Sequence, residues 1–364
     1  MRRGPVIVLI FILVVAAVIG ASQFMGAQPP LEITVAVSPL AGTWVTNAAN
    51  SFNASNALVN GTRRVQVKVT TIDDLAVWSD AGQSQWLTAH PTAWIPASSA
   101  SIGYANRLSF DTVQPSLAQT VLVWGGFGDR VDALTDTGAH PLDWDDVDRA
   151  AVAGTWASIP GANASWGNIN LAFSRPSGSM SGLAVLFSGA AAFSKQAAVS
   201  GSTVVSSDYQ NWMEPILQSV PNYNTLGTSV AQTLAARGSS VGDIALLPES
   251  EWLNNLTGQL INSGNPIRLS YPAYSFVFDF PLARWQGLTD DENKAVEAFG
   301  AYLLTQHPET NGLRPVGGVV AQTATLFANA ASYGVELAPD LTLALQAPPR
   351  AETQRLLVWA AAVR

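Results

Sequence analysis

The folded part of the chain opens with Glu32-Ile33-Thr34-Val35-Ala36-Val37, followed at once by Ser38-Pro39. β-Branched residues dominate the opening positions, which predicts a short strand that ends at the serine and the proline. Trp44, Ala48 and Phe52 then recur at helical spacing, which predicts an amphipathic helix after the strand. The stretch therefore predicts a strand that leads directly into a helix, the unit from which α/β sheets are built.

The alternation of strand and helix continues along the rest of the chain. Further strands are expected at residues 65–69, 93–96, 120–124, 171–173 and 243–247, and helices at residues 181–192, 208–220, 230–237, 289–303, 321–331 and 352–363. A Thr-x-x-Glu capping box at Thr289 and Glu292 marks the start of one of these helices. The pattern predicts an α/β fold with mainly parallel sheets that carry helices on both faces.

The length of the chain, 364 residues, predicts two lobes rather than one core. A single hydrophobic core rarely grows beyond about 250 to 300 residues before a chain divides into domains. The segment 267–281 has aromatic residues at alternate positions, which indicates extended chain that returns to the first lobe. We therefore expect two Rossmann-like lobes: lobe I from residues 31–119 and 280–364, and lobe II from residues 120–279. The C-terminal helices are expected to pack on lobe I.

Residues 1–30 have the features of an export signal. Arg2 and Arg3 precede an apolar stretch at residues 6–21, and Gln28-Pro29-Pro30 then interrupts it. Positive charge before an apolar segment keeps the N-terminus in the cytoplasm and places the following chain outside. We expect residues 1–30 to form a hydrophobic helix that is either a cleaved signal peptide or a membrane anchor. The rest of the protein is expected to be extracytoplasmic.

Composition narrows the classes of function. The net charge is -8 and the chain has no run of basic residues, which argues against a nucleic-acid partner. No cysteine occurs, which excludes disulfides, thiolate metal sites and a lipid-bearing cysteine. The glycines at 125–128 lack the further glycine and the acid of a dinucleotide site, and the histidines lie far apart in the sequence. We expect no catalytic residue, no cofactor and no metal.

Ligand contacts are expected where strands end, because ligands of open α/β sheets bind at the carboxyl ends of the strands. The serine-bearing turns in such places are Ser38-Pro39, the 97–101 turn with Ser98 and Ser99, and the 174–182 loop with Ser177, Ser179 and Ser181. Hydroxyl and backbone N–H groups there can hold an anion or a polar oxygen. The alternatives are a helix cap at Ser38, a local turn at 97–101 and a flexible loop at 174–182.

Several short motifs follow one another in a fixed order along the folded part. They are Val37-Ser38-Pro39, Pro91-Thr92-Ala93-Trp94-Ile95-Pro96, Ser181-Gly182-Leu183, Leu247-Pro248-Glu249-Ser250, Tyr271-Pro272, residues 279–285 and Gly312-Leu313-Arg314-Pro315. In these motifs the chain resembles the bacterial extracellular solute-binding proteins of the molybdate- and sulfate-binding class, particularly the group often found with von Willebrand factor A modules. The resemblance implies a type 2 periplasmic-binding fold, in which two lobes joined by extended crossovers close over a ligand.

The resemblance also implies which residues contact the ligand. Carried over to this sequence, they are Ser38 with Ser98 or Ser99 from the first lobe, and Ser179 or Ser181 with Glu249 from the second. Two features depart from the family pattern: the lipid-bearing cysteine is missing, and Glu249 would repel an oxyanion unless it is turned away or paired. These departures argue against specificity for molybdate or sulfate.

The function implied is capture of a small polar ligand between the lobes, for uptake or sensing. The expected partners are the ligand and a membrane permease or a von Willebrand factor A-type protein. The alternative is a cell-surface scaffold or sensory domain that keeps the fold without transport, which the missing cysteine and an uncleaved anchor favour. An enzyme ranks third, because the sequence offers no nucleophile, base and orienting group that belong together.

Overall fold

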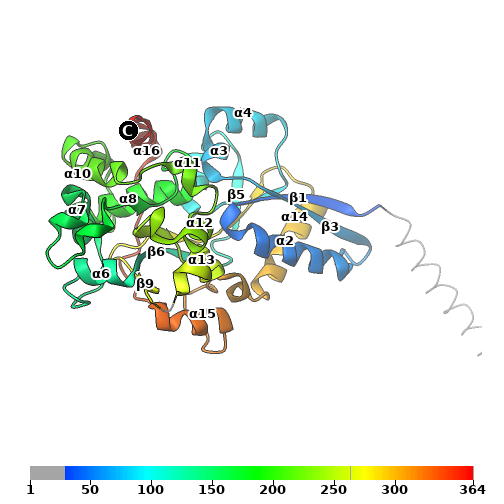
Figure 1. Ribbon diagram of the computed structural model, residues 1–364. Helices are drawn as coiled ribbons and strands as arrows, with labels where there is room; N and C mark the ends of the chain where they lie inside the picture. The colour runs from blue at the N-terminus through cyan, green and yellow to red at the C-terminus, as the bar shows by residue number, and fades with distance from the viewer. Residues whose placement is uncertain (1–28, 263, 364) are drawn as a thin grey trace, which may run out of the picture.

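The computed structural model describes residues 29–262 and 264–363. The chain forms two lobes, each built around one β-sheet with helices packed against it (Figure 1). The hydrophobic helix predicted at residues 1–30, and with it the choice between a signal peptide and an anchor, lies outside the described residues. Among the described residues, no helix is long and apolar enough to cross a membrane.

The first sheet is built around the strand that opens the folded part. Its strands, in spatial order, are β2 (Leu58–Val59), β3 (Arg63–Thr71), β1 (Leu31–Val37), β4 (Ala93–Ile95), β11 (Leu282–Trp285) and β5 (Phe110–Gln114). β1 has a parallel neighbour on each side, with Val35 opposite Val69 of β3 and Ala93 of β4. The carboxyl ends of β1, β3 and β4 therefore meet at one edge of the sheet.

The second sheet is built around β6. Its strands, in spatial order, are β10 (Val277–Phe278), β6 (Thr120–Phe127), β8 (Ile244–Pro248) and β7 (Leu171–Ala172), and β9 (Ile267–Ser270) also pairs with β6. Every residue of β6 is buried, which explains why its sequence is continuously apolar instead of alternating. β7 and β8 are parallel, so the residues that follow them lie at the same edge of this sheet.

The expectation of mainly parallel sheets holds only for part of the molecule. β11 runs antiparallel to β4 and β5, and β6 runs antiparallel to β8, β9 and β10. The reason lies in the crossings between the lobes. The chain passes from β5 to β6 and returns from β10 to β11, so its two passes run in opposite directions on each sheet.

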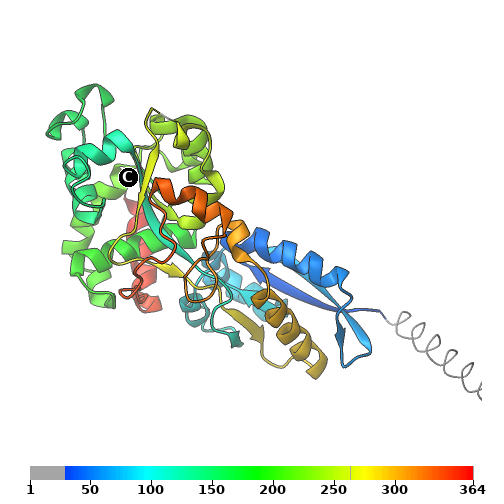
Figure 2. The same cartoon turned by 90° about the horizontal axis from the view of Figure 1, so that it is seen from below.

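Helices cover both sheets. They are α2 (Pro39–Ala54), α3 (Asp74–Trp78), α4 (Asp80–Thr88), α5 (Ser99–Tyr104), α6 (Gly128–Leu134), α7 (Trp144–Ala153), α8 (Met180–Ser194), α9 (Gly201–Val204), α10 (Ser207–Gln218), α11 (Tyr223–Leu226), α12 (Val230–Arg237), α13 (Glu249–Asn255), α14 (Asp290–Leu304), α15 (Thr325–Ala330) and α16 (Arg350–Ala362). α14 packs on α2 and β1, so distant parts of the chain build the first lobe together (Figures 1 and 2). Its predicted capping box is present at Thr289 and Glu292.

The C-terminal helices contact more than the lobe in which the sequence pattern placed them. α15 packs on α13 and α16 packs on α9, and both partners belong to the second lobe. α16 also touches the first lobe, where the Tyr104 hydroxyl lies 3.3 Å from that of Thr353. An apolar helix face shows that a helix is covered, but it does not show which lobe covers it. The assignment of the chain after α14 to lobe I stays a prediction, since α15 contacts the second lobe and α16 contacts both lobes.

The chain passes from β5 of the first sheet to β6 of the second through residues 115–119, and from β10 back to β11 through residues 279–281. The two crossings are tied together, because the N–H of Leu117 donates to the carbonyl of Phe280 at 3.1 Å. Phe280 is buried and has a φ of 40°, a left-handed conformation that a non-glycine residue rarely adopts. The fold thus holds a constrained residue at the point where the lobes join.

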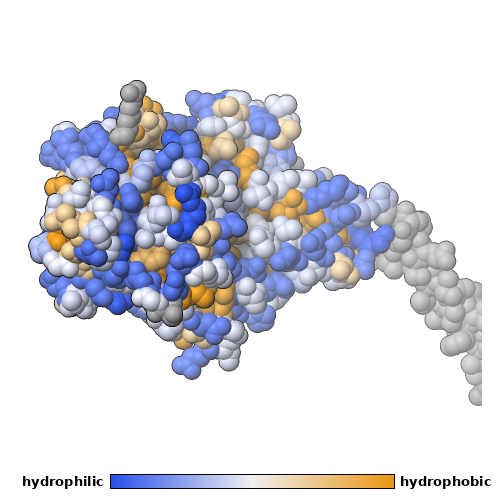
Figure 3. Space-filling view, viewed as in Figure 1, coloured by the Kyte–Doolittle hydropathy of each residue, from blue (hydrophilic) through white to orange (hydrophobic). Residues whose placement is uncertain are grey.

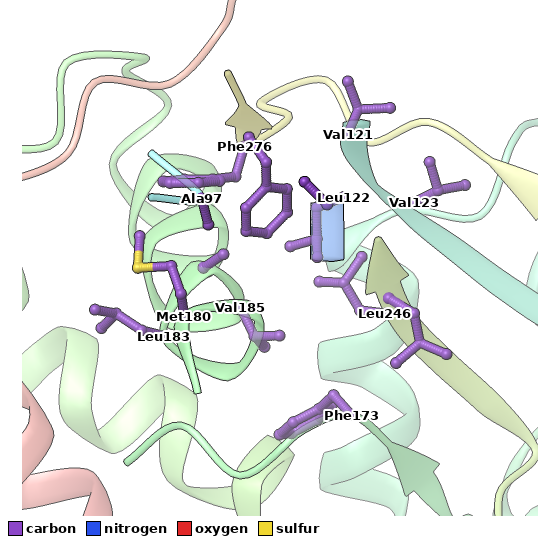
Figure 4. Packing of buried hydrophobic residues seen from close by; sticks show 14 of the residues in the cluster. Ala97, Val121, Leu122, Val123, Phe173, Met180, Leu183, Val185, Leu246 and Phe276 are labelled. Carbon is purple, nitrogen blue, oxygen red and sulfur yellow. The ribbon is translucent and has the colours of Figure 1, made fainter. Parts of the chain in front are cut away.

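The buried side chains form one continuous cluster that runs through both lobes. Figure 4 shows Val185 of α8 on the side of the helix toward Leu122 of β6 and Leu246 of β8, whereas Leu183 points to the opposite side. On the outside, hydrophilic residues cover most of the face seen in Figure 3, and hydrophobic residues show as separate patches. The stability of the protein therefore rests on this shared core.

Candidate functional site

A cavity of about 550 Å³ lies between the edges at which the two sheets end. The first lobe contributes Ser38, Pro39, Leu40 and Asp73, and the second contributes residues that include Phe173, Arg175, Ser179, Ser181, Tyr223, Asn224 and Glu251. A volume of this size suits a small molecule. The serine-bearing turns after β1 and after β7 thus face the same cavity from opposite lobes.

Ser38 is the first-lobe residue at the head of α2. It is 1% exposed, and its side chain makes no capping hydrogen bond within the described structure. Its N–H donates to the carbonyl of Ile95 at 2.8 Å, which ties the end of β1 to the end of β4. The Ser38 hydroxyl therefore does not act as the helix cap that was the alternative interpretation, and it lies on the cavity.

Ser179 and Ser181 stand at the head of α8 on the opposite side. Ser179 caps this helix, since its hydroxyl accepts the N–H of Gly182 at 3.2 Å. A Cβ at Gly182 would lie 2.3 Å from the carbonyl oxygen of Arg175, so the loop before the helix packs directly on its first turn. This close packing argues that the 174–182 loop is held in place by its glycine.

The side chain of Asp73 makes a contact across the cavity. Asp73 follows β3 in the first lobe, and its carboxylate accepts the N–H of Met180 at 3.2 and 3.1 Å, at the head of α8 in the second. The same carboxylate caps α3 by accepting the N–H of Leu75 at 2.9 Å. Burial raises the pKa of Asp73 above its usual value, and the two N–H donors oppose this. The head of α8 is thus occupied by a carboxylate of the chain itself.

Glu251 is an acidic residue of α13 that also lines the cavity. Its Oε2 atom is buried and has no hydrogen-bond partner among the described residues. Burial raises the pKa of Glu251 to about 7. A buried carboxylate oxygen without a donor is costly, so this atom is a candidate contact for a ligand.

Arg175 supplies a positive charge at the same cavity. Its guanidinium carbon lies 5.0 Å from the centre of the Tyr223 ring, and its Nη2 donates to Oδ1 of Asn224 at 3.3 Å. The stacked guanidinium, the ring and the amide form one polar and aromatic wall. Such a wall can hold both the apolar and the polar parts of a small ligand.

Three of the predicted contacts lie outside this cavity: Ser98, Ser99 and Ser177. Ser98 and Ser99 line a second cavity of about 740 Å³ together with Asp279 and the 344–347 segment. The N–H of Ser99 donates to Oδ1 of Asp279 at 2.8 Å, so a carboxylate of the chain occupies the head of α5 as well. Ser177 lines a third cavity of about 330 Å³ beside α16. The predicted contacts are therefore divided among three cavities.

Glu249 is fully buried in an ion pair. The Nε and Nη2 atoms of Arg314 donate to its two carboxylate oxygens, each at 2.6 Å, and the Tyr271 hydroxyl donates to the same carboxylate. Arg314 also donates to the carbonyl of Gly318 at 2.8 Å. The sequence left two arrangements open for Glu249, turned away from the ligand or paired, and the structure shows the paired one. The immediate role of the pair is to hold the C-terminal segment on the second lobe.

Sequence reasoning did not identify Asp73, Arg175, Tyr223, Asn224 or Glu251. A signal for Asp73 existed, because it follows β3 as Ser38 follows β1, and the strand-end rule applies equally to both. Arg175 lay inside the predicted 174–182 loop but was not singled out. Tyr223, Asn224 and Glu251 reach the cavity only through tertiary packing.

Comparisons with known proteins agree with this architecture. No protein-family model and no curated protein matches the sequence. Among solved structures, the chain is similar to an ABC substrate-binding protein from Listeria monocytogenes in complex with cycloalternan, with 10% identity, a TM-score of 0.60 and coverage of 92% of this chain and 95% of that one. It is also similar to maltose-bound MalE3 of T. maritima, with 11% identity, a TM-score of 0.57 and coverage of 92% and 94%.

The chain has the type 2 periplasmic-binding fold. A solute-binding protein from Agrobacterium radiobacter in complex with ribitol supports the same conclusion, with 12% identity, a TM-score of 0.56 and coverage of 91% of this chain and 99% of that one. At these low sequence identities, the structural similarity shows the fold but does not identify the ligand. The finer placement in the molybdate- and sulfate-binding class, and the von Willebrand factor A-type partner, stay predictions.

Proposed function

We propose that this protein is an extracytoplasmic solute-binding protein that captures a small polar ligand between its two lobes, for uptake through a permease or for sensing. The observation that carries the proposal is the cavity that both lobes line, with Ser38 on one side and Ser179 and Ser181 on the other. A ligand that contacts both lobes binds the closed form better than the open form, and this difference drives closure. Binding without catalysis is the role that we assign.

A thermal-shift screen of oxyanions, sugars, amino acids and short peptides tests the proposal. A ligand at about 100 times its Kd adds about 2.7 kcal/mol to the free energy of unfolding, which such a screen detects. For a ligand so found, Ser38→Ala should weaken binding by roughly twofold to tenfold, the worth of one hydrogen bond. Ser177→Ala makes the same change outside the cavity and should leave affinity unchanged. Equal effects of the two substitutions would contradict the assignment of the cavity.

A scaffold or sensory domain without transport is the second candidate, and the Asp73 contact favours it. The hydrogen bonds from Met180 to Asp73 join the lobes with groups of the chain alone. Cross-linking on intact cells distinguishes the two functions. Recovery of a permease supports uptake, whereas recovery of another surface protein, such as one with a von Willebrand factor A module, supports the scaffold.

A further inference from the structure

Two glutamates of α13 have opposite environments. Glu249 lies in a fully buried ion pair with Arg314. Glu251 lies two positions further along the same helix and lines the cavity, and its buried Oε2 has no hydrogen-bond partner among the described residues. Buried acidic groups in native proteins are normally paired. The fold therefore pairs one carboxylate of this helix internally and leaves the other facing the ligand space.

The cavity is poorly suited to an anion. The head of α8, where N–H groups would hold an anionic ligand, is occupied by the carboxylate of Asp73. The lining residues include two acidic groups, Asp73 and Glu251, and the basic Arg175, whose guanidinium lies over the Tyr223 ring and donates to Asn224. An anion that binds at the head of α8 would have to displace Asp73.

We propose that the ligand carries a protonated amine, and that Glu251 is the residue that binds this amine. The inference rests on the proposed function, since it names the ligand class of the same cavity. An ammonium group supplies the donors that Oε2 lacks, and the charge-assisted hydrogen bond is stronger than a neutral one. Tyr223 and Phe173 line the same cavity and supply aromatic surface for the apolar part of a small amine.

The proposal predicts how binding changes with pH. The pKa of Glu251 is raised to about 7 by burial, and an ammonium group beside it favours the ionised form. Binding of an amine therefore lowers this pKa and releases a proton at pH 6 to 7. The affinity for the amine should rise between pH 6 and pH 8, as Glu251 loses its proton before the ligand arrives.

Calorimetric titration of the purified protein with ethanolamine and putrescine tests the inference, with ribitol and sulfate as uncharged and anionic probes. We expect an amine to bind, with proton release measured in buffers of different ionisation enthalpy. Glu251→Gln keeps the shape of the side chain and removes an unpaired charge, so the variant should fold at least as stably. It should weaken amine binding at least tenfold and abolish the rise between pH 6 and pH 8.

Glu214→Gln makes the same chemical change on α10, outside the cavity, and should leave amine binding unchanged. Binding of ribitol or sulfate that Glu251→Gln leaves intact, without amine binding, would overturn the amine assignment and leave ligand capture standing. Amine binding that is equally strong in Glu251→Gln would overturn the role of Glu251. If neither ethanolamine nor putrescine binds, the amine assignment is overturned, and the thermal-shift screen described above decides separately whether the capture function stands.

Discussion

Asp74 is a carboxyl group that the fold encloses completely beneath the first lobe's edge. Its oxygens accept the N–H of Ala97 at 3.0 Å and the hydroxyl of Ser101 at 2.5 Å. Burial, aided by the charge of Asp73, raises the pKa of Asp74 to about 8. At neutral pH this residue is therefore mostly protonated, because the uncharged form is the one that a buried site tolerates.

The raised pKa of Asp74 predicts that stability falls as the pH rises from 3.8 to about 8. In this window the folded state keeps a proton that the unfolded state releases, which costs up to about 1.4 kcal/mol per pH unit. The contribution is fully present below the window and lost above it. Urea unfolding at pH 5 and pH 8 measures the effect. Asp74→Asn, which stays neutral, should show a flatter profile, and identical profiles would refute the assignment.

Single residues also show how far the site could be predicted. Ser38, Ser179 and Ser181 line the cavity, because the end of a strand is where a sheet exposes backbone and hydroxyl groups to a ligand. The position of Glu251 on the cavity could not be predicted from the sequence. Glu251 cannot be distinguished from Glu249 two positions earlier, because only the tertiary position of Arg314 decides which carboxylate is paired.

At the scale of elements, segments with strong periodicity were predicted well and short segments were missed. α2 contains the predicted apolar positions Trp44, Ala48 and Phe52, all buried, and β1 and α8 appear close to their expected bounds. α3 and β5 were not predicted, since five residues of mixed character carry no clear period. The direction of β11 could not be predicted from the sequence either, because it depends on the path of the chain between the lobes.

The capping box of α14 supports a prediction at this scale. The Thr289 hydroxyl accepts the N–H of Glu292 at 3.3 Å, and Glu292 accepts the N–H of Thr289 at 2.8 Å. Thr289→Ala should lower the free energy of unfolding by about 1 kcal/mol, measured by urea denaturation. Glu292→Gln keeps a side chain that capping boxes accept and should cost less. A larger loss for the glutamine variant would show that the charge of Glu292, not the cap, matters.

At the scale of the whole molecule, we expect the contact between Asp73 and Met180 to influence the balance between open and closed forms. Asp73→Ala removes the hydrogen bonds that join it to Met180 across the cavity, so the open form should become more populated. Small-angle X-ray scattering of the unliganded protein should then give a larger radius of gyration. Asp208→Ala, an exposed change on α10, is the matched control. An unchanged radius in Asp73→Ala would show that the contact does not hold the lobes.

The C-terminal segment is held to the second lobe by Arg314. Arg314→Met should destabilise the protein by about 3 to 5 kcal/mol, because it leaves the carboxylate of Glu249 buried without its partner. The double variant Arg314→Met with Glu249→Leu removes both charges and should recover much of this loss. Chemical denaturation of the single and double variants decides the point. A double variant as unstable as the single one would indicate that packing, not charge, is responsible.

The path of the chain determines which pieces of this protein can exist alone. The first sheet takes strands from residues 31–114 and again from 282–285, and the second lobe needs Arg314 from beyond both. A gene fragment that encodes residues 120–279 would contain a whole sheet and yet leave the buried carboxyl group of Glu249 without its Arg314 partner. We therefore expect neither half of the molecule to fold alone, and a split-protein reporter made from this scaffold would have to be cut at an exposed loop within a lobe.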